Sequence, residues 1–92
     1  MSLEESIGVV LRELRRKRCL TQEALAVQAG LHRTYISMLE RGEKSPTVDV
    51  LARLALAMDT TGSEILRRAE KAVRVECRST APSPVPPRRR AP

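Results

Sequence analysis

Two short stretches with helical character, residues 21–29 and 32–41, are each followed directly by a glycine. Thr21 opens the first stretch, and a threonine at this position can cap the free N–H groups of a helix start. Gly30 and Gly42 follow the two stretches, and glycine readily adopts the left-handed conformation that ends a helix. Two helices joined by so short a turn predict a helix-turn-helix.

The second of these helices has two chemically different faces. At about 100° per residue, Ile36 and Leu39 lie on one side and turn toward the body of the domain. The polar side has residues suited to reading DNA, because Arg bonds guanine, Thr and Ser bond several bases, and apolar atoms contact the thymine methyl group. A solvated helix face is the other interpretation of this pattern. The residues on this side are Arg33, Thr34, Ser37, Met38 and Arg41.

A wider set of residues resembles the Cro/repressor type of helix-turn-helix domain. This family includes phage repressors, restriction–modification controllers and many antitoxins. The resemblance covers roughly residues 6–76 and implies a compact all-α fold of five helices, like the lambda repressor, that binds double-stranded DNA. The residues that carry it are Gln22, Leu25, Ala26, Gly30, Tyr35, Ile36, Ser37, Leu39, Glu40, Arg41 and Gly42.

The resemblance also implies roles for individual residues. Gln22 would bond a DNA phosphate, and Arg15 would form a structural ion pair with Glu40. His32 stands where the family often has Ser, so it would cap the helix, contact phosphate or add pH sensitivity. Cys19 stands where the family often has Gly, which suggests that the first helix ends differently here.

Placement along the second motif helix separates base contacts from phosphate contacts. Arg33, Thr34, Ser37 and Met38 are expected to read bases. Arg41 and Lys44 lie at or past the helix end, where phosphate contacts are expected instead.

Helical periodicity and capping residues predict five helices, at residues 3–18, 21–29, 32–41, 47–58 and 62–76, and no strand. The helix at 47–58 is apolar nearly all round, which favours burial on all sides. A domain this small cannot supply that cover alone, so a homodimer is expected. The predicted interface residues are Val50 and Leu56 of this helix and, as the resemblance implies for the fifth helix, Ile65 and Leu66.

The last residues differ in composition from the rest of the chain. Residues 77–92 contain five prolines, four arginines and no acidic residue, whereas residues 1–76 hold 13 basic against 11 acidic residues. This predicts a helix-turn-helix domain at 1–76 and a disordered Pro/Arg-rich tail at 77–92. The tail arginines either add phosphate affinity or only solubilise the chain. Because the tail supplies most of the net charge, that charge is weak evidence for DNA binding.

Several classes of protein find no support. The two cysteines and single histidine supply no metal ligand set or disulfide framework, so neither a metal nor another cofactor is expected. No catalytic constellation or phosphate loop indicates an enzyme. No signal peptide or membrane span is recognisable, which predicts a cytoplasmic location.

The favoured function is therefore a sequence-specific transcription regulator that binds a near-palindromic operator as a homodimer. The alternative is an antitoxin or interaction module whose main task is to bind a partner protein. Operator sequence, activation or repression, and any effector stay open at this level.

Overall fold

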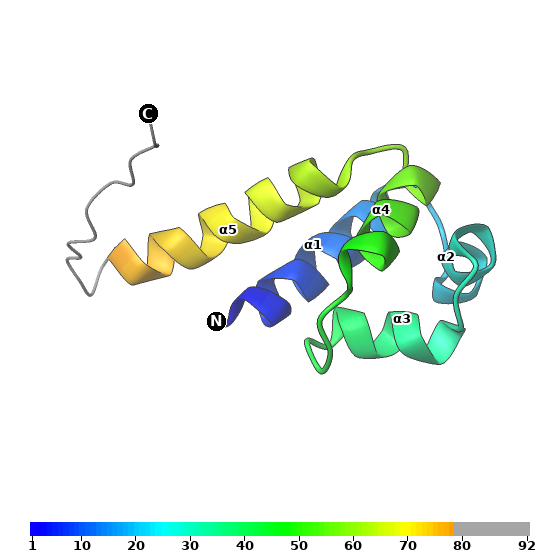
Figure 1. The fold of residues 1–92 in the computed structure, drawn as a ribbon, viewed down its shortest axis with the longest axis horizontal. Helices are drawn as coiled ribbons and strands as arrows, with labels where there is room; N and C mark the ends of the chain where they lie inside the picture. The colour runs from blue at the N-terminus through cyan, green and yellow to red at the C-terminus, as the bar shows by residue number, and fades with distance from the viewer. Residues whose placement is uncertain (79–92) are drawn as a thin grey trace, which may run out of the picture.

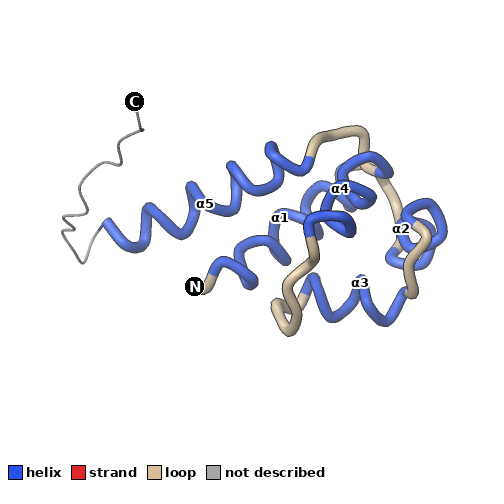
Figure 2. Tube along the Cα trace, viewed as in Figure 1, coloured by secondary structure: helices blue, strands red, loops and turns tan. Residues whose placement is uncertain are grey.

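The computed structural model describes residues 1–78, which form five helices joined by short loops and contain no strand (Figure 1, Figure 2). All five predicted helices are present, with ends within two residues of the predicted ones. The predicted tail lies outside the described residues except for residues 77 and 78, which still belong to the fifth helix. The helices are α1 (Leu3–Lys17), α2 (Gln22–Ala29), α3 (Arg33–Glu40), α4 (Val48–Ala57) and α5 (Gly62–Arg78).

The first four helices end in the same way, with one residue in the left-handed conformation. After α2 and α3 this residue is a glycine, Gly30 or Gly42, as the sequence predicts. After α1 and α4 it is Cys19, with φ 58°, and Asp59, with φ 60°. The expectation that α1 ends differently was therefore wrong.

The reason lies in the hydrogen bonds that this turn of α1 makes. The N–H of Cys19 donates to the carbonyl of Arg16, and that of Leu20 donates to the carbonyl of Arg15. This pair of bonds is the Schellman motif, which satisfies carbonyls at the end of a helix. These bonds stabilise a conformation that costs a non-glycine residue about 1–2 kcal/mol.

Side-chain caps define the helix starts. Thr21, Thr47 and Thr61 each accept the N–H of the residue three positions ahead. Ser2 and Glu5 form a reciprocal capping box at the start of α1, which the sequence patterns above did not predict.

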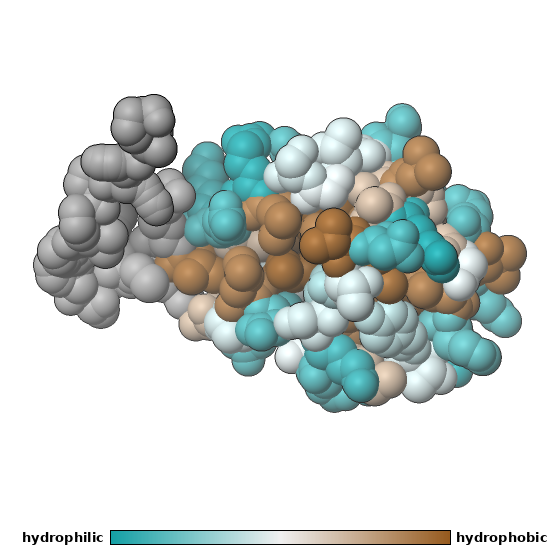
Figure 3. All heavy atoms as spheres, viewed as in Figure 1, coloured by the Kyte–Doolittle hydropathy of each residue, from teal (hydrophilic) through white to brown (hydrophobic). Residues whose placement is uncertain are grey.

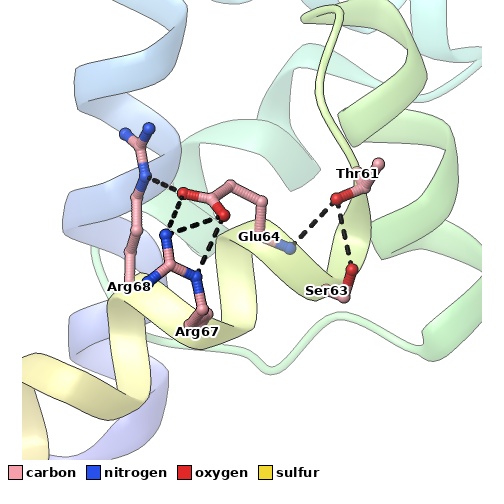
Figure 4. Close-up of polar contacts among 5 residues, drawn as sticks. All are labelled: Thr61, Ser63, Glu64, Arg67 and Arg68. Atoms are coloured by element: carbon pink, nitrogen blue, oxygen red, sulfur yellow. Dashed lines mark hydrogen bonds and ion pairs between the residues drawn. The ribbon is translucent and has the colours of Figure 1, made fainter.

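Thr61 and Glu64 at the start of α5 match the S/T-x-x-E pattern of a capping box, but only half of that box forms. The hydroxyl of Thr61 accepts the N–H of Glu64, but the carboxylate of Glu64 turns to Arg67 and Arg68 on the next turn (Figure 4). Arg68 Nε lies 2.8 Å from Glu64 Oε2, and Arg67 Nη2 lies 3.0 Å from both carboxylate oxygens. These donors lower the pKa of Glu64, with Arg68 contributing most.

One apolar core receives side chains from all five helices. α5 packs along α1, and the buried hydroxyl of Ser6 on α1 donates to the carbonyl of Ala69 on α5 at 2.9 Å. α2 packs against both α3 and α4. The largest apolar side chains that are almost fully buried are Leu11, Leu25, Ile36, Leu39, Leu54, Met58 and Ile65.

α4 is only partly covered by its own chain. Leu51, Leu54 and Ala55 are buried, whereas Val48 is 85% exposed and Leu56 is 82% exposed. One chain therefore covers one side of α4 and leaves the other side open, and burial of that side would need the second subunit that the sequence predicts. The predicted interface role of Ile65 is wrong, because this side chain is fully buried in the core of its own chain and offers no surface to a partner.

Among residues 1–78, no helix is both long enough and apolar enough to span a membrane.

Candidate nucleic-acid interface

α3 lies along one edge of the molecule, opposite α5 (Figure 1). Ile36 and Leu39 fix it to the core, since each is only 1% exposed. Its other side carries the predicted base-reading residues: Arg33 and Thr34 are exposed, and Ser37 and Met38 are half-buried. Figure 3 shows the lower edge, where α3 lies, as largely white and teal, while brown apolar residues gather across the middle of this face. The structure therefore brings these four residues to one polar, outward-facing helix surface.

An ion pair ties α3 to α1. Arg15 Nε lies 2.6 Å from Glu40 Oε2, and Arg15 Nη2 lies 3.0 Å from Glu40 Oε1. The side chains are 11% and 3% exposed, so this two-bond pair is largely shielded from water. The hydrogen bond to Glu40 raises the pKa of Arg15. The pair that the family resemblance implied is therefore present, and it fixes the orientation of α3 relative to α1.

Gln22, the first residue of α2, joins this network. Its Nε2 donates to Glu40 Oε1 at 3.1 Å, so one carboxylate connects α1, α2 and α3. A side-chain amide has two N–H donors. The second N–H of Gln22 is thus the group that a phosphate oxygen could accept, with the first bond holding the amide in place.

His32 is the N-cap residue of α3, but its side chain makes no capping hydrogen bond. Capping, one of the three roles considered for His32, is therefore excluded. The imidazole is exposed beside the positive end of α3, where an anion would be stabilised. Lys44 is exposed in the loop that follows α3.

Arg41, a predicted phosphate contact, has two protein partners for its guanidinium. Arg41 Nη1 donates to Ser37 Oγ at 2.6 Å, while Nε and Nη2 donate to Glu43 at 2.8 Å and 3.2 Å. The bonds between Arg41 and Glu43 raise the pKa of Arg41 and lower the pKa of Glu43. A phosphate could accept only from the two N–H groups that the bonds to Glu43 and Ser37 leave free, unless it displaced one of these partners.

Sequence reasoning missed Glu43, because residues two apart do not face each other on a helix. Here the chain reverses at Gly42, whose φ of 76° brings Glu43 back beside Arg41. An acidic residue directly after a helix-ending glycine, with an arginine just before that glycine, is the signal that was available.

The fold and this surface together define a helix-turn-helix domain, with α2 and α3 as the motif. A family model described as helix-turn-helix matches residues 11–65. The chain belongs to this family.

Relatives are similar over most of the chain. Control protein C.SmaI of Serratia marcescens is 40% identical over 68 residues, which cover 74% of this chain and 81% of the relative. The restriction-modification controller protein C.AhdI of Aeromonas hydrophila is 38% identical, with a TM-score of 0.65, over 66% of this chain and 92% of the other. The clp gene regulator ClgR of Corynebacterium glutamicum is 28% identical, with a TM-score of 0.77, over 83% and 81%.

Proposed function

We propose that this protein is a sequence-specific DNA-binding transcription regulator that reads its operator with α3. The observation that carries the proposal is the outward face of α3, where four side chains suited to base contacts lie together: Arg33, Thr34, Ser37 and Met38. Hydrogen bonds from α1 and α2 to Glu40 fix this helix to the rest of the domain. Arg is the side chain best suited to guanine, and Thr, Ser and Met supply hydroxyl and apolar contacts to other bases. Relatives named as a control protein and a gene regulator support the regulatory role.

Phosphate contacts would fix the register of the domain on DNA. We assign Gln22, His32 and Lys44 to this role, since all three border α3 and none belongs to its base-reading face. Contacts of this kind position a protein on DNA and carry no sequence information themselves. DNA binding is also consistent with the cytoplasmic location predicted from the sequence.

The chain acts as a homodimer in this proposal. An exposed apolar stripe on α4, formed by Val48, Ala52 and Leu56, supports it, because such a surface on a small domain favours burial against a partner. Val50 and Leu66 are half-buried and would lie at the edge of the contact. Two α3 helices about 34 Å apart would then read a near-palindromic operator.

Selection of bound sites from random duplex DNA tests the proposal. The full chain should enrich one sequence with two related half-sites about one helical turn apart. Recovery of DNA without any shared sequence, at a salt concentration where binding is measurable, would contradict sequence-specific regulation.

A further inference from the structure

The end of α3 carries a chain of hydrogen bonds that runs from Glu43 through Arg41 to Ser37. Three of the five guanidinium N–H groups of Arg41 are engaged, two by the Glu43 carboxylate and one by the Ser37 hydroxyl. The 2.6 Å distance from Arg41 Nη1 to Ser37 Oγ is short, as expected for a charged donor. Arg41 is thus oriented by Glu43 and in turn orients Ser37.

The bond from Arg41 restricts what Ser37 can offer to DNA. A serine hydroxyl has one O–H donor and two acceptor lone pairs, whereas a guanidinium only donates. Ser37 is therefore the acceptor in this pair, and its own O–H makes no hydrogen bond within residues 1–78. A second donor approaching Oγ would also come close to the positive charge of Arg41, which is unfavourable.

We propose that Glu43 and Arg41 are positioning residues that make Ser37 a hydrogen-bond donor toward DNA, an inference that rests on base reading by α3. In the major groove, guanine N7 and O6, adenine N7 and thymine O4 are acceptors, whereas cytosine presents its N4 amino donor. Ser37 should therefore prefer a base with an acceptor at the edge it faces and discriminate against cytosine there. Specificity at this base pair depends on Glu43, which itself contacts no DNA.

Competition binding with the full chain tests this, using the selected operator and all its single-base variants at fixed salt. Ser37→Ala identifies the base pair that Ser37 reads, by the loss of discrimination at that pair. Arg41→Met and Glu43→Ala should each reduce discrimination at the same pair by about three- to tenfold, the worth of one hydrogen bond. Preferences at the other pairs should persist. Arg41→Met should add little to Ser37→Ala, because both act through one hydroxyl.

Matched controls remove the same charges elsewhere. Arg12→Met on α1 and Glu70→Ala on α5 change exposed residues away from α3 and should leave every base preference intact. Circular dichroism establishes that each variant is folded.

Three results would overturn the inference while leaving the proposed function intact. Arg41→Met could weaken all sequences equally and lower the salt slope by about 0.9, which identifies a phosphate anchor. Glu43→Ala could strengthen all sequences equally, which identifies a charge that merely repels the DNA backbone. Ser37→Ala could leave every base preference unchanged. Absence of any preferred sequence for the unmodified chain would instead contradict the proposed function itself.

Discussion

Gly8 lies in the middle of α1, where a glycine ordinarily weakens a helix. A Cβ atom at this position would lie 2.5 Å from the carbonyl oxygen of Leu39 and 2.6 Å from that of Glu40. The missing side chain therefore allows α1 to pass directly against the last turn of α3. Arg15, about two turns further along α1, bonds the side chain of Glu40.

Gly8→Ala should consequently destabilise the domain. Helix propensity favours alanine by about 1 kcal/mol, but overpacking costs about 1–3 kcal/mol. Contact with two backbone carbonyls should place this site in the upper part of that range, because neither can move without shifting α3. The measurement is the free energy of unfolding in urea. Gly62→Ala is the control, since its Cβ would meet Leu51 at an ordinary 3.6 Å, and a gain in stability at Gly8 matching this control would contradict the close-packing argument.

For single residues, sequence patterns predict which side chains face outward better than they predict the hydrogen-bond partners of those side chains. The outward position of Arg33 and Thr34 follows from helical spacing alone. The pair of Arg15 with Glu40 required a family resemblance, because 25 positions separate the two residues. The bonds from Arg41 to Glu43 were missed, since they depend on the reversal of the chain at Gly42.

For whole helices, the sequence likewise predicts some features and not others, as the helix ends show. Gly30 and Gly42 mark two ends in the sequence, but Cys19 and Asp59 adopt the same left-handed turn without that signal. The existence of all five helices was predictable because periodicity extends over whole helices. Their terminal conformations depend on single residues, and Arg18 helps one of these ends by donating to the carbonyl of Met58.

The start of α5 offers a test of electrostatics by pH. Arg68 and Arg67 lower the pKa of Glu64 below its ordinary value of 4.5. The folded state therefore binds this proton less readily than the unfolded state, so the contribution of Glu64 is complete above about pH 4.5. It is lost as pH falls through the lower folded value.

Glu64→Gln should thus destabilise the domain slightly at neutral pH and progressively less in acid. The check is urea unfolding of both proteins from about pH 7 down to about pH 3, a range over which a glutamate carboxylate gains its proton. A difference between the two proteins that grows toward low pH would contradict the assigned direction of the pKa change.

For the whole molecule, the arrangement of exposed apolar side chains is the main unexplained feature of an isolated chain. Leu56 and Val48 lie on one stripe of α4, and Val27 of α2 lines a groove beside Leu56. The sequence predicted an excess of apolar residues on α4 and named Leu56 for the interface, and the structure leaves Leu56 exposed while Leu54 is buried. The exposure of Val48 became apparent only in the three-dimensional arrangement.

Leu56→Glu should convert the proposed dimer to a monomer with little loss of folding, because the side chain is already exposed. Sedimentation equilibrium at micromolar concentration measures the change. Val9→Glu places the same charge on an exposed valine of α1 and should leave the dimer intact. Dissociation by Val9→Glu in place of Leu56→Glu would move the interface from α4 to the side of α1.

Base reading by α3 is tested most directly at Arg33. Arg33 is exposed at the N-terminal end of α3, the end that contacts base edges in this mode of docking. Its guanidinium can donate to O6 and N7 of one guanine. Gln22→Ala is the matched variant, because Gln22 is a proposed phosphate contact that is already bonded to Glu40.

Competition binding of Arg33→Ala and Gln22→Ala to the operator and its single-base variants is the decisive measurement. Arg33→Ala should weaken binding to the operator by about 1–3 kcal/mol and much less to DNA with another base at the contacted pair. Gln22→Ala should weaken all sequences similarly. Equal weakening of every sequence by Arg33→Ala would contradict base reading by this residue and leave Arg33 as a phosphate contact.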